Sequence, residues 1–222
     1  MSRQRKLAGF ALVEIAIALI ILALLGAGAL TALRVQSQRS HLSDTRMSLD
    51  NARSAILGYV AANGTVPCPA ATTDGIATYN AGGNCANNPG RLPWSTLGIT
   101  QAEGQDAWGQ TLSYMVATNF TTTQPPATAN TITLSTGNSG SEISGGFISI
   151  CSTLCTSTTG NKLSSDKTVA LALWSTGEDQ HDNSYLSTGT LLVTGGTDDV
   201  VIWMSRYVLL DELISAGRTV QP

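Results

Sequence analysis

The chain has 222 residues and carries 12 Lys or Arg against 15 Asp or Glu, which gives a formal net charge of −3. Residues 1–55 hold most of the basic side chains, and the rest of the chain stands at −7. That balance, and the lack of a basic stripe with interleaved aromatic residues, argue against nucleic acid as a partner. The length suits one domain of moderate size.

The first predicted element is a long apolar helix. A basic leader precedes an apolar run from Phe10 to Leu33 that is interrupted by Glu14 and Thr31. At about 1.5 Å per helical residue, the run is long enough to cross roughly 30 Å of hydrocarbon. The basic leader would keep the N-terminus in the cytoplasm and send the rest of the chain across. The sequence therefore predicts a membrane-spanning segment at 10–33, with membrane lipid as its partner.

Two ordinary explanations of this run stay open. A secretory signal would be cut after Ala27-Gly28-Ala29, so that the mature chain begins at Leu30. An uncleaved anchor would keep the whole run. Either would make the protein a membrane-anchored or secreted periplasmic binding protein or enzyme, and neither accounts for Glu14, because a carboxylate costs a few kcal/mol at the centre of a bilayer.

Gly9-Phe10-Ala11-Leu12-Val13-Glu14 resembles the processing site of type IV pilins and of type II secretion pseudopilins, although Ala11 replaces the commoner Thr or Ser. The resemblance implies that a prepilin peptidase cuts after Gly9 and that the new N-terminal Phe10 is N-methylated. It also implies a structural subunit, a minor pilin or pseudopilin, rather than an enzyme. Its partners would be other pilin or pseudopilin subunits, and Glu14 would pair with a neighbour's N-terminal amine on assembly.

The same resemblance implies a location and a domain order. A cytoplasmic leader would occupy residues 1–9, the assembly helix 10–33, its amphipathic continuation 34–63 and a periplasmic head 64–222. The protein would sit in the bacterial inner membrane and then in a pilus or pseudopilus fibre.

Helical periodicity continues beyond the apolar run. Leu42, Leu49 and Ile56 recur every seven residues, with Thr45 and Ala52 in the turns between them. Asn63-Gly64 is a C-terminal stop signal. The pattern predicts one helix from about Phe10 to Ala62, whose second half packs against the head.

Four cysteines lie in the head, at Cys68, Cys85, Cys151 and Cys155. An even count in an oxidising compartment indicates disulfides. Of the three possible connectivities, the two local pairs, Cys68 with Cys85 and Cys151 with Cys155, are favoured. A zinc site is the rival interpretation, but the spacings do not match paired C-x-x-C units.

The head segment Asp106-Ala107-Trp108-Gly109 is similar to segments of many pilin-like proteins that precede the first strand of the sheet. It predicts a tight turn into a strand, with Trp94 and Trp108 covering the seam between helix and sheet. Strands are expected at 111–117, 131–135, 146–151, 168–175, 190–194 and 200–205.

A short amphipathic helix is expected at Tyr207–Ala216, capped by Ser205, stopped at Gly217 and apolar on one face; that face comprises Leu209, Leu210, Leu213 and Ile214. The resemblance thus implies a pilin-like α+β fold, with a long N-terminal helix packed on an antiparallel β-sheet and a short C-terminal helix.

Acidic residues flank one predicted strand, and four are candidate calcium ligands: Asp179, Asp182, Asp198 and Asp199. Major pseudopilins hold calcium in a C-terminal loop of similar character, and carboxylate oxygens suit this hard cation. The same residues serve equally well as solvated turns. A Ser-His-Asp site around His181 lacks any supporting motif, so no catalytic residue and no other cofactor is assigned.

Overall fold

The computed structural model describes residues 12–117, 120–121, 131–133, 148–151, 163, 168–179, 185–186, 190–192, 198–217 and 219–221, without the side chains of 25–33, 131–133, 149, 185–186, 190–192 and 219–221. The chain divides into two compact units, Met1–Ser40 and His41–Pro222. The expectations for Gly9, Phe10, Cys155 and Asp182 lie outside the described residues.

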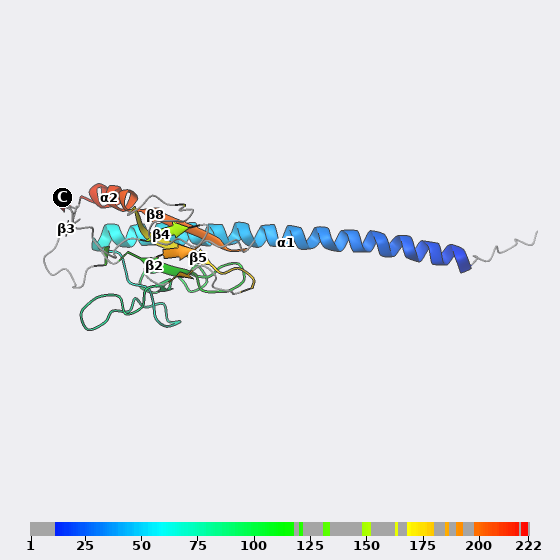
Figure 1. Ribbon diagram of the computed structural model, residues 1–222, viewed down its shortest axis with the longest axis horizontal. Helices are drawn as coiled ribbons and strands as arrows, with labels where there is room; N and C mark the ends of the chain where they lie inside the picture. Colours follow the sequence, from blue (N-terminus) through cyan, green and yellow to red (C-terminus); the bar gives the residue numbers. More distant parts are fainter. Residues whose placement is uncertain are drawn as a thin grey trace, which may run out of the picture. The chain divides into compact units, whose positions relative to one another are not determined.

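One helix, α1, runs over 52 residues from Leu12 to Asn63 (Figure 1). Its end agrees with the stop signal in the sequence. Gly64 has a φ of 74°, a conformation that costs glycine little. Its N–H donates a 2.7 Å hydrogen bond to the carbonyl of Val60, which satisfies one of the last free carbonyls of the helix.

The sequence predicted that the first half of the helix, residues 10–33, spans a membrane. For the part of the chain that the structure describes, this prediction is wrong. No helix there combines the length and the apolar character needed to cross a membrane. From Arg34 onward the helix carries charged side chains.

Within the second unit, α1 packs as its periodicity predicts. Leu49, Ala52 and Ile56 are fully buried, and Thr45 between the same turns is also inaccessible. Leu42 is partly buried against this core. The stripe joins one hydrophobic cluster with the apolar side chains of the sheet described next, so the heptad pattern of the sequence identifies the buried face of the helix.

The main sheet of the second unit has four antiparallel strands in the order β1-β2-β5-β8. All seven residues of the central strand β5 are buried, as expected for a strand with neighbours on both sides and a helix over one face. Three of the strands fall within predicted ranges, whereas β1 was not predicted. The bounds are Gly90–Arg91 for β1, Ser113–Val116 for β2, Val169–Ser175 for β5 and Val200–Ser205 for β8.

The remaining described strands form two smaller sheets rather than extending the antiparallel one. β3 (Thr131–Thr133) pairs in parallel with β9 (Thr219–Gln221). β4 (Ser149–Cys151) pairs in parallel with β7 (Thr190–Leu192), which pairs antiparallel with β6 (Tyr185–Leu186). The expectation of a single antiparallel sheet is therefore only partly right, because the long connections between these strands allow parallel pairing.

The C-terminal helix α2 spans Arg206–Ser215 and ends before Gly217, whose φ is 74°. Leu209 and Leu213 are buried, but Ile214 is 62% exposed, so the apolar face is narrower than predicted. Ser205 occupies the N-cap position in an extended conformation, yet its side chain makes no capping hydrogen bond. Ser205 thus occupies the predicted N-cap position, but the prediction that its side chain caps the helix is wrong.

Candidate functional site

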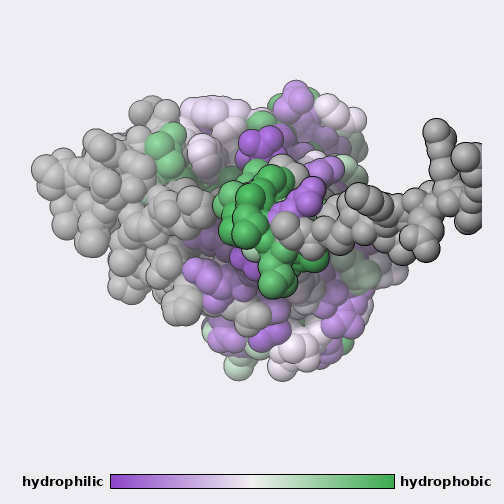
Figure 2. Space-filling model, turned by 90° about the vertical axis from the view of Figure 1, so that its right-hand side faces the viewer, coloured by the Kyte–Doolittle hydropathy of each residue, from purple (hydrophilic) through white to green (hydrophobic). Residues whose placement is uncertain are grey.

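The first described turns of α1 form an exposed apolar surface. Nine large apolar side chains between Leu12 and Leu24 are accessible, from 48% of Ile15 to 87% of Leu12. Figure 2, which looks toward the N-terminal end of α1, shows apolar residues gathered there in green. An apolar surface of this kind marks an interaction site. Its members are Leu12, Val13, Ile15, Ile17, Leu19, Ile20, Ile21, Leu22 and Leu24.

Glu14 lies in this exposed apolar segment and is itself exposed. Residues three and seven positions further along a helix share its face, so its neighbours there are Ile17 and Ile21. Glu14 thus gives an otherwise apolar surface one charged position. A cation on a partner would fix the register of the two surfaces by pairing with Glu14.

In the second unit, the turn at Asp106–Gly109 forms as predicted. The Oδ1 atom of Asp106 accepts hydrogen bonds from the backbone N–H groups of Trp108 at 3.0 Å and Gln110 at 2.8 Å. Gly109 has a φ of 80°, which explains the glycine at this position. Asp106 is only 6% exposed, and its Oδ2 atom accepts a hydrogen bond from the Ser175 hydroxyl.

Helix α1 holds this turn through Thr45 and His41, a role that the sequence did not predict for either residue. The Oγ1 atom of buried Thr45 accepts a hydrogen bond from the N–H of Ala107 at 3.2 Å. One turn earlier, the imidazole of His41 stacks on the indole of Trp108, with ring centroids 5.5 Å apart. Trp108 therefore lies against the helix as expected.

Trp94, the second indole expected at the seam, has its recorded contacts in loops. A Cβ added to Gly75 would lie 2.3 Å from the indole of Trp94, and one added to Gly104 would lie 2.9 Å from its Cβ. The two glycines therefore make room for the ring. The contacts show a packing role for Trp94.

The structure contains a disulfide between Cys68 and Cys85, one of the two favoured local pairs. It closes a loop with little apolar content, which by the chain-entropy model stabilises the fold by about 3 kcal/mol. Buried Cys151 in β4 is also disulfide-bonded. Because Cys155 lies outside the described residues, the second pairing stays a prediction.

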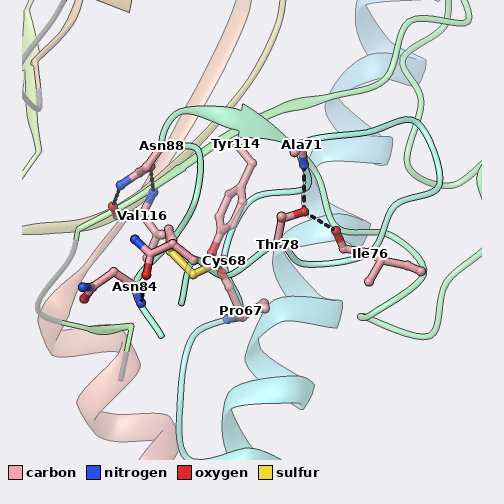
Figure 3. The surroundings of a disulfide bond; sticks show 11 residues. Pro67, Cys68, Ala71, Ile76, Thr78, Asn84, Asn88, Tyr114 and Val116 are labelled. Carbon is pink, nitrogen blue, oxygen red and sulfur yellow. Dashed lines mark hydrogen bonds between the residues drawn. A yellow bond between two sulfur atoms is a disulfide. The ribbon is translucent and has the colours of Figure 1, made fainter. Parts of the chain in front are cut away.

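Fully buried Tyr114 of β2 lies beside the Cys68–Cys85 disulfide (Figure 3). Its hydroxyl donates a 3.0 Å hydrogen bond to the carbonyl of Pro67. Burial, and then the nearby hydroxyls of Tyr79 and Tyr59, raise the pKa of Tyr114 well above its ordinary value. The neutral phenol is thus the form that fits the folded protein.

Three of the four candidate calcium ligands come together. Oxygen atoms of Asp179, Asp198 and Asp199 all lie within 4.8 Å of one another. Asp198 also has a structural contact, because its Oδ2 accepts a 2.8 Å hydrogen bond from the N–H of Glu178. The group has the oxygen chemistry that Ca²⁺ prefers, but exposed carboxylates in turns have it too, and calcium binding stays a prediction.

Comparisons of the chain with protein-family models, curated proteins and solved structures found no match. We therefore infer its function from the residues themselves. The exposed apolar surface at Leu12–Leu24, with Glu14 in it, is the feature that a protein folding and acting alone would least need.

Proposed function

We propose that this chain is a structural subunit, a minor pilin or pseudopilin, of a type IV pilus or a type II secretion system. A prepilin peptidase cuts between Gly9 and Phe10, and Phe10 becomes N-methylated. The processed chain assembles with other subunits through the first part of α1. It acts by assembling and presenting its head, not by catalysis.

The observation that carries this proposal is the exposure of the apolar side chains between Leu12 and Leu24. Burying one Leu, Ile or Val side chain yields about 1.5–3 kcal/mol. Nine such side chains on one stretch of α1 would give a strong driving force for packing against equivalent helices of other subunits. An apolar helix of this kind is the natural core element of a helical fibre.

Glu14 supports the proposal because it supplies the register that apolar packing lacks. Cleavage after Gly9 would create an amine on Phe10, close in sequence to Glu14. Pairing of that amine with Glu14 of the next subunit would neutralise both charges only when the subunits are correctly aligned. The Cys68–Cys85 disulfide supports a head outside the cytoplasm, in the periplasm and then on a fibre, since disulfides persist in oxidising compartments.

The mature N-terminus tests this proposal directly. The full chain would be expressed with and without a prepilin peptidase of the same organism, and its N-terminus would be determined by mass spectrometry. We expect a methylated Phe10 as the first residue when the peptidase is present. Gly9→Ala should abolish that product, because it changes the residue directly before the proposed cut.

Two other products would overturn the proposal. A mature chain that starts at Leu30 would indicate an ordinary secretory signal. A chain that keeps Met1 when an active peptidase processes a known prepilin in the same cells would indicate no prepilin processing. Either result would favour the alternative that the protein is a binding protein or an enzyme of the periplasm.

A further inference from the structure

Two different parts of the chain cover the edge of β2: a short strand and a single side chain. β1 pairs with it at Ser113 and Tyr114 only. At Val116 the neighbour is instead the side chain of Asn88, whose Oδ1 accepts a 3.1 Å hydrogen bond from the Val116 N–H and whose Nδ2 donates to the Val116 carbonyl (Figure 3). The Asn88 amide thus satisfies both backbone groups, as a neighbouring strand would.

Asn88 lies between β1, which begins two residues later, and a segment that the disulfide holds. It lies three residues after Cys85, directly after an exposed stretch from Asn80 to Asn87 in which only Gly83 and Cys85 are half-buried. The backbone hydrogen bonds of this stretch run within it, such as Asn80 N–H to Asn84 O, and to the neighbouring turn, where Ala86 N–H donates to Thr78 O. Such a segment, with little buried apolar surface, has low local stability.

Cys68, the other end of the bond, belongs to a part of the chain that the core holds. It is inaccessible to solvent, and the preceding carbonyl, of Pro67, accepts the hydrogen bond from buried Tyr114. Two residues later, Ala70 exchanges hydrogen bonds of 2.9 and 3.0 Å with Arg91 of β1. The disulfide therefore ties a mostly exposed segment to a part of the chain that the core holds.

We propose that the Cys68–Cys85 disulfide is a redox-sensitive latch that keeps Asn88 on the edge of β2. A dithiol reductant opens it: two electrons pass to the S–S bond, two protons complete the thiols of Cys68 and Cys85, and the dithiol closes to its own disulfide. Asn88 then leaves Val116, while β1 stays on the sheet through its pairs with Ser113, Tyr114 and Ala70. The opened edge presents a free N–H and a free carbonyl, the groups that a further strand would bind.

The strand itself provides an internal control for testing the latch. The N–H of Val116 points to Asn88, whereas the next N–H, of Ala117, donates a 2.7 Å hydrogen bond to Ala170 of β5. Opening of the latch releases the first amide and leaves the second protected. General loosening of the head would release both.

The test is residue-resolved amide hydrogen exchange on the full chain, kept soluble in a mild detergent. The double variant Cys68→Ser/Cys85→Ser is compared with the matched control Cys151→Ser/Cys155→Ser and with the unmodified chain. We expect exchange at Val116 to rise about tenfold or more in the first variant, with less than about a twofold change at Ala117. The control variant should leave the ratio of the two rates unchanged.

Asn88→Ala provides a second test that keeps the disulfide, so it remains informative if the cysteine variant folds poorly. It should produce the same selective rise at Val116. Equal acceleration at Val116 and Ala117 in the cysteine variant would show a general stabiliser rather than a latch. Unchanged exchange at Val116 in either variant would also overturn the proposal.

Discussion

The hydroxyl of Ser175, the last residue of β5, donates a 2.6 Å hydrogen bond to the Oδ2 atom of Asp106, 69 positions earlier in the chain. The same hydroxyl accepts a hydrogen bond from the N–H of Gly177. Because Oδ1 of Asp106 already organises the turn through Trp108 and Gln110, one buried carboxylate joins two distant turns. A short side chain with two acceptor oxygens is needed at that point.

Asp106→Ala should lower the free energy of unfolding by about 3 kcal/mol, because it leaves two N–H groups and a hydroxyl without their acceptor in a buried site. Ser175→Ala should cost less, about 1–2 kcal/mol. Urea unfolding followed by tryptophan fluorescence measures both. In a double-mutant cycle the two losses should not add, since the variants share one hydrogen bond. Fully additive losses would contradict this coupling.

Thr45→Val should destabilise the head by about 1–2 kcal/mol although it keeps the shape of the side chain. The cost arises because the N–H of Ala107 loses the Oγ1 acceptor in a buried position. Thr45→Ser, which keeps the hydroxyl, is the matched control and should lose less stability. Thermal unfolding of the two variants provides the comparison, and equal losses would assign the effect of Thr45 to packing.

Stability should fall at alkaline pH because of Tyr114. Its pKa is raised in the folded protein by burial and by nearby tyrosine hydroxyls, so the neutral form is favoured there. The contribution of Tyr114 to the free energy of unfolding is complete below about pH 10, where the phenol is neutral in the unfolded chain as well. Above that pH the free energy of unfolding falls by up to about 1.4 kcal/mol per pH unit. Urea midpoints measured from pH 8 to beyond pH 10 should show this slope. Tyr114→Phe should flatten it, and a slope unchanged in that variant would rule out Tyr114 as its origin.

Gly177→Ala should cost more stability than Gly217→Ala. Both glycines have positive φ values, 67° and 74°, so both substitutions carry backbone strain. A Cβ at Gly177 would also lie 2.5 Å from Oδ2 of Asp198, whereas one at Gly217 meets nothing within 4 Å. We expect a difference of about 1–2 kcal/mol in chemical unfolding. A Gly217 variant that is as unstable as the Gly177 variant would exclude the contact with Asp198 as the cause.

Glu14→Gln should reduce assembly without changing the head. Loss of the carboxylate removes the proposed partner of a neighbour's N-terminal amine, so we expect the assembled fraction to fall about tenfold or more. Glu212→Gln, which neutralises a half-buried glutamate of α2, is the control. Assembly is measured by shearing and sedimentation of fibres from cells, and unfolding of the head should be the same in both variants. Normal assembly of the Glu14 variant would contradict the proposed role.

Features set by local chemistry were predictable from the sequence. The end of α1 follows from Asn63-Gly64, the buried face of α1 from the heptad of Leu49 and Ile56, and the tight turn from Asp106 and Gly109. In each case the residues that determine the feature lie close together in the sequence. The Cys68–Cys85 pair was also the favoured local choice.

Features that depend on distant partners were not predictable. The two-residue strand β1 exists because Ala70 and β2 bind it from both sides, and nothing in Gly90-Arg91 indicates a strand. Asn88 looked like one of several loop asparagines, and its role appears only when Val116 lies beside it. The narrow buried face of α2 likewise depends on tertiary packing, which covers Leu209 and Leu213 but leaves Ile214 exposed. Residues 10–33 were expected to span a membrane, but no helix in the described part of the chain is both long and apolar enough to do so.

The position of β5 has a consequence for the order of folding. Its neighbour β2 precedes it in the chain and its other neighbour, β8, follows it, ending at Ser205. A chain emerging from a ribosome or a translocon therefore presents seven consecutive residues destined for the interior before the strand that covers one of their edges has been delivered. Because closing such non-local pairs is slow, we expect completion of the sheet to be a late step in the folding of the head.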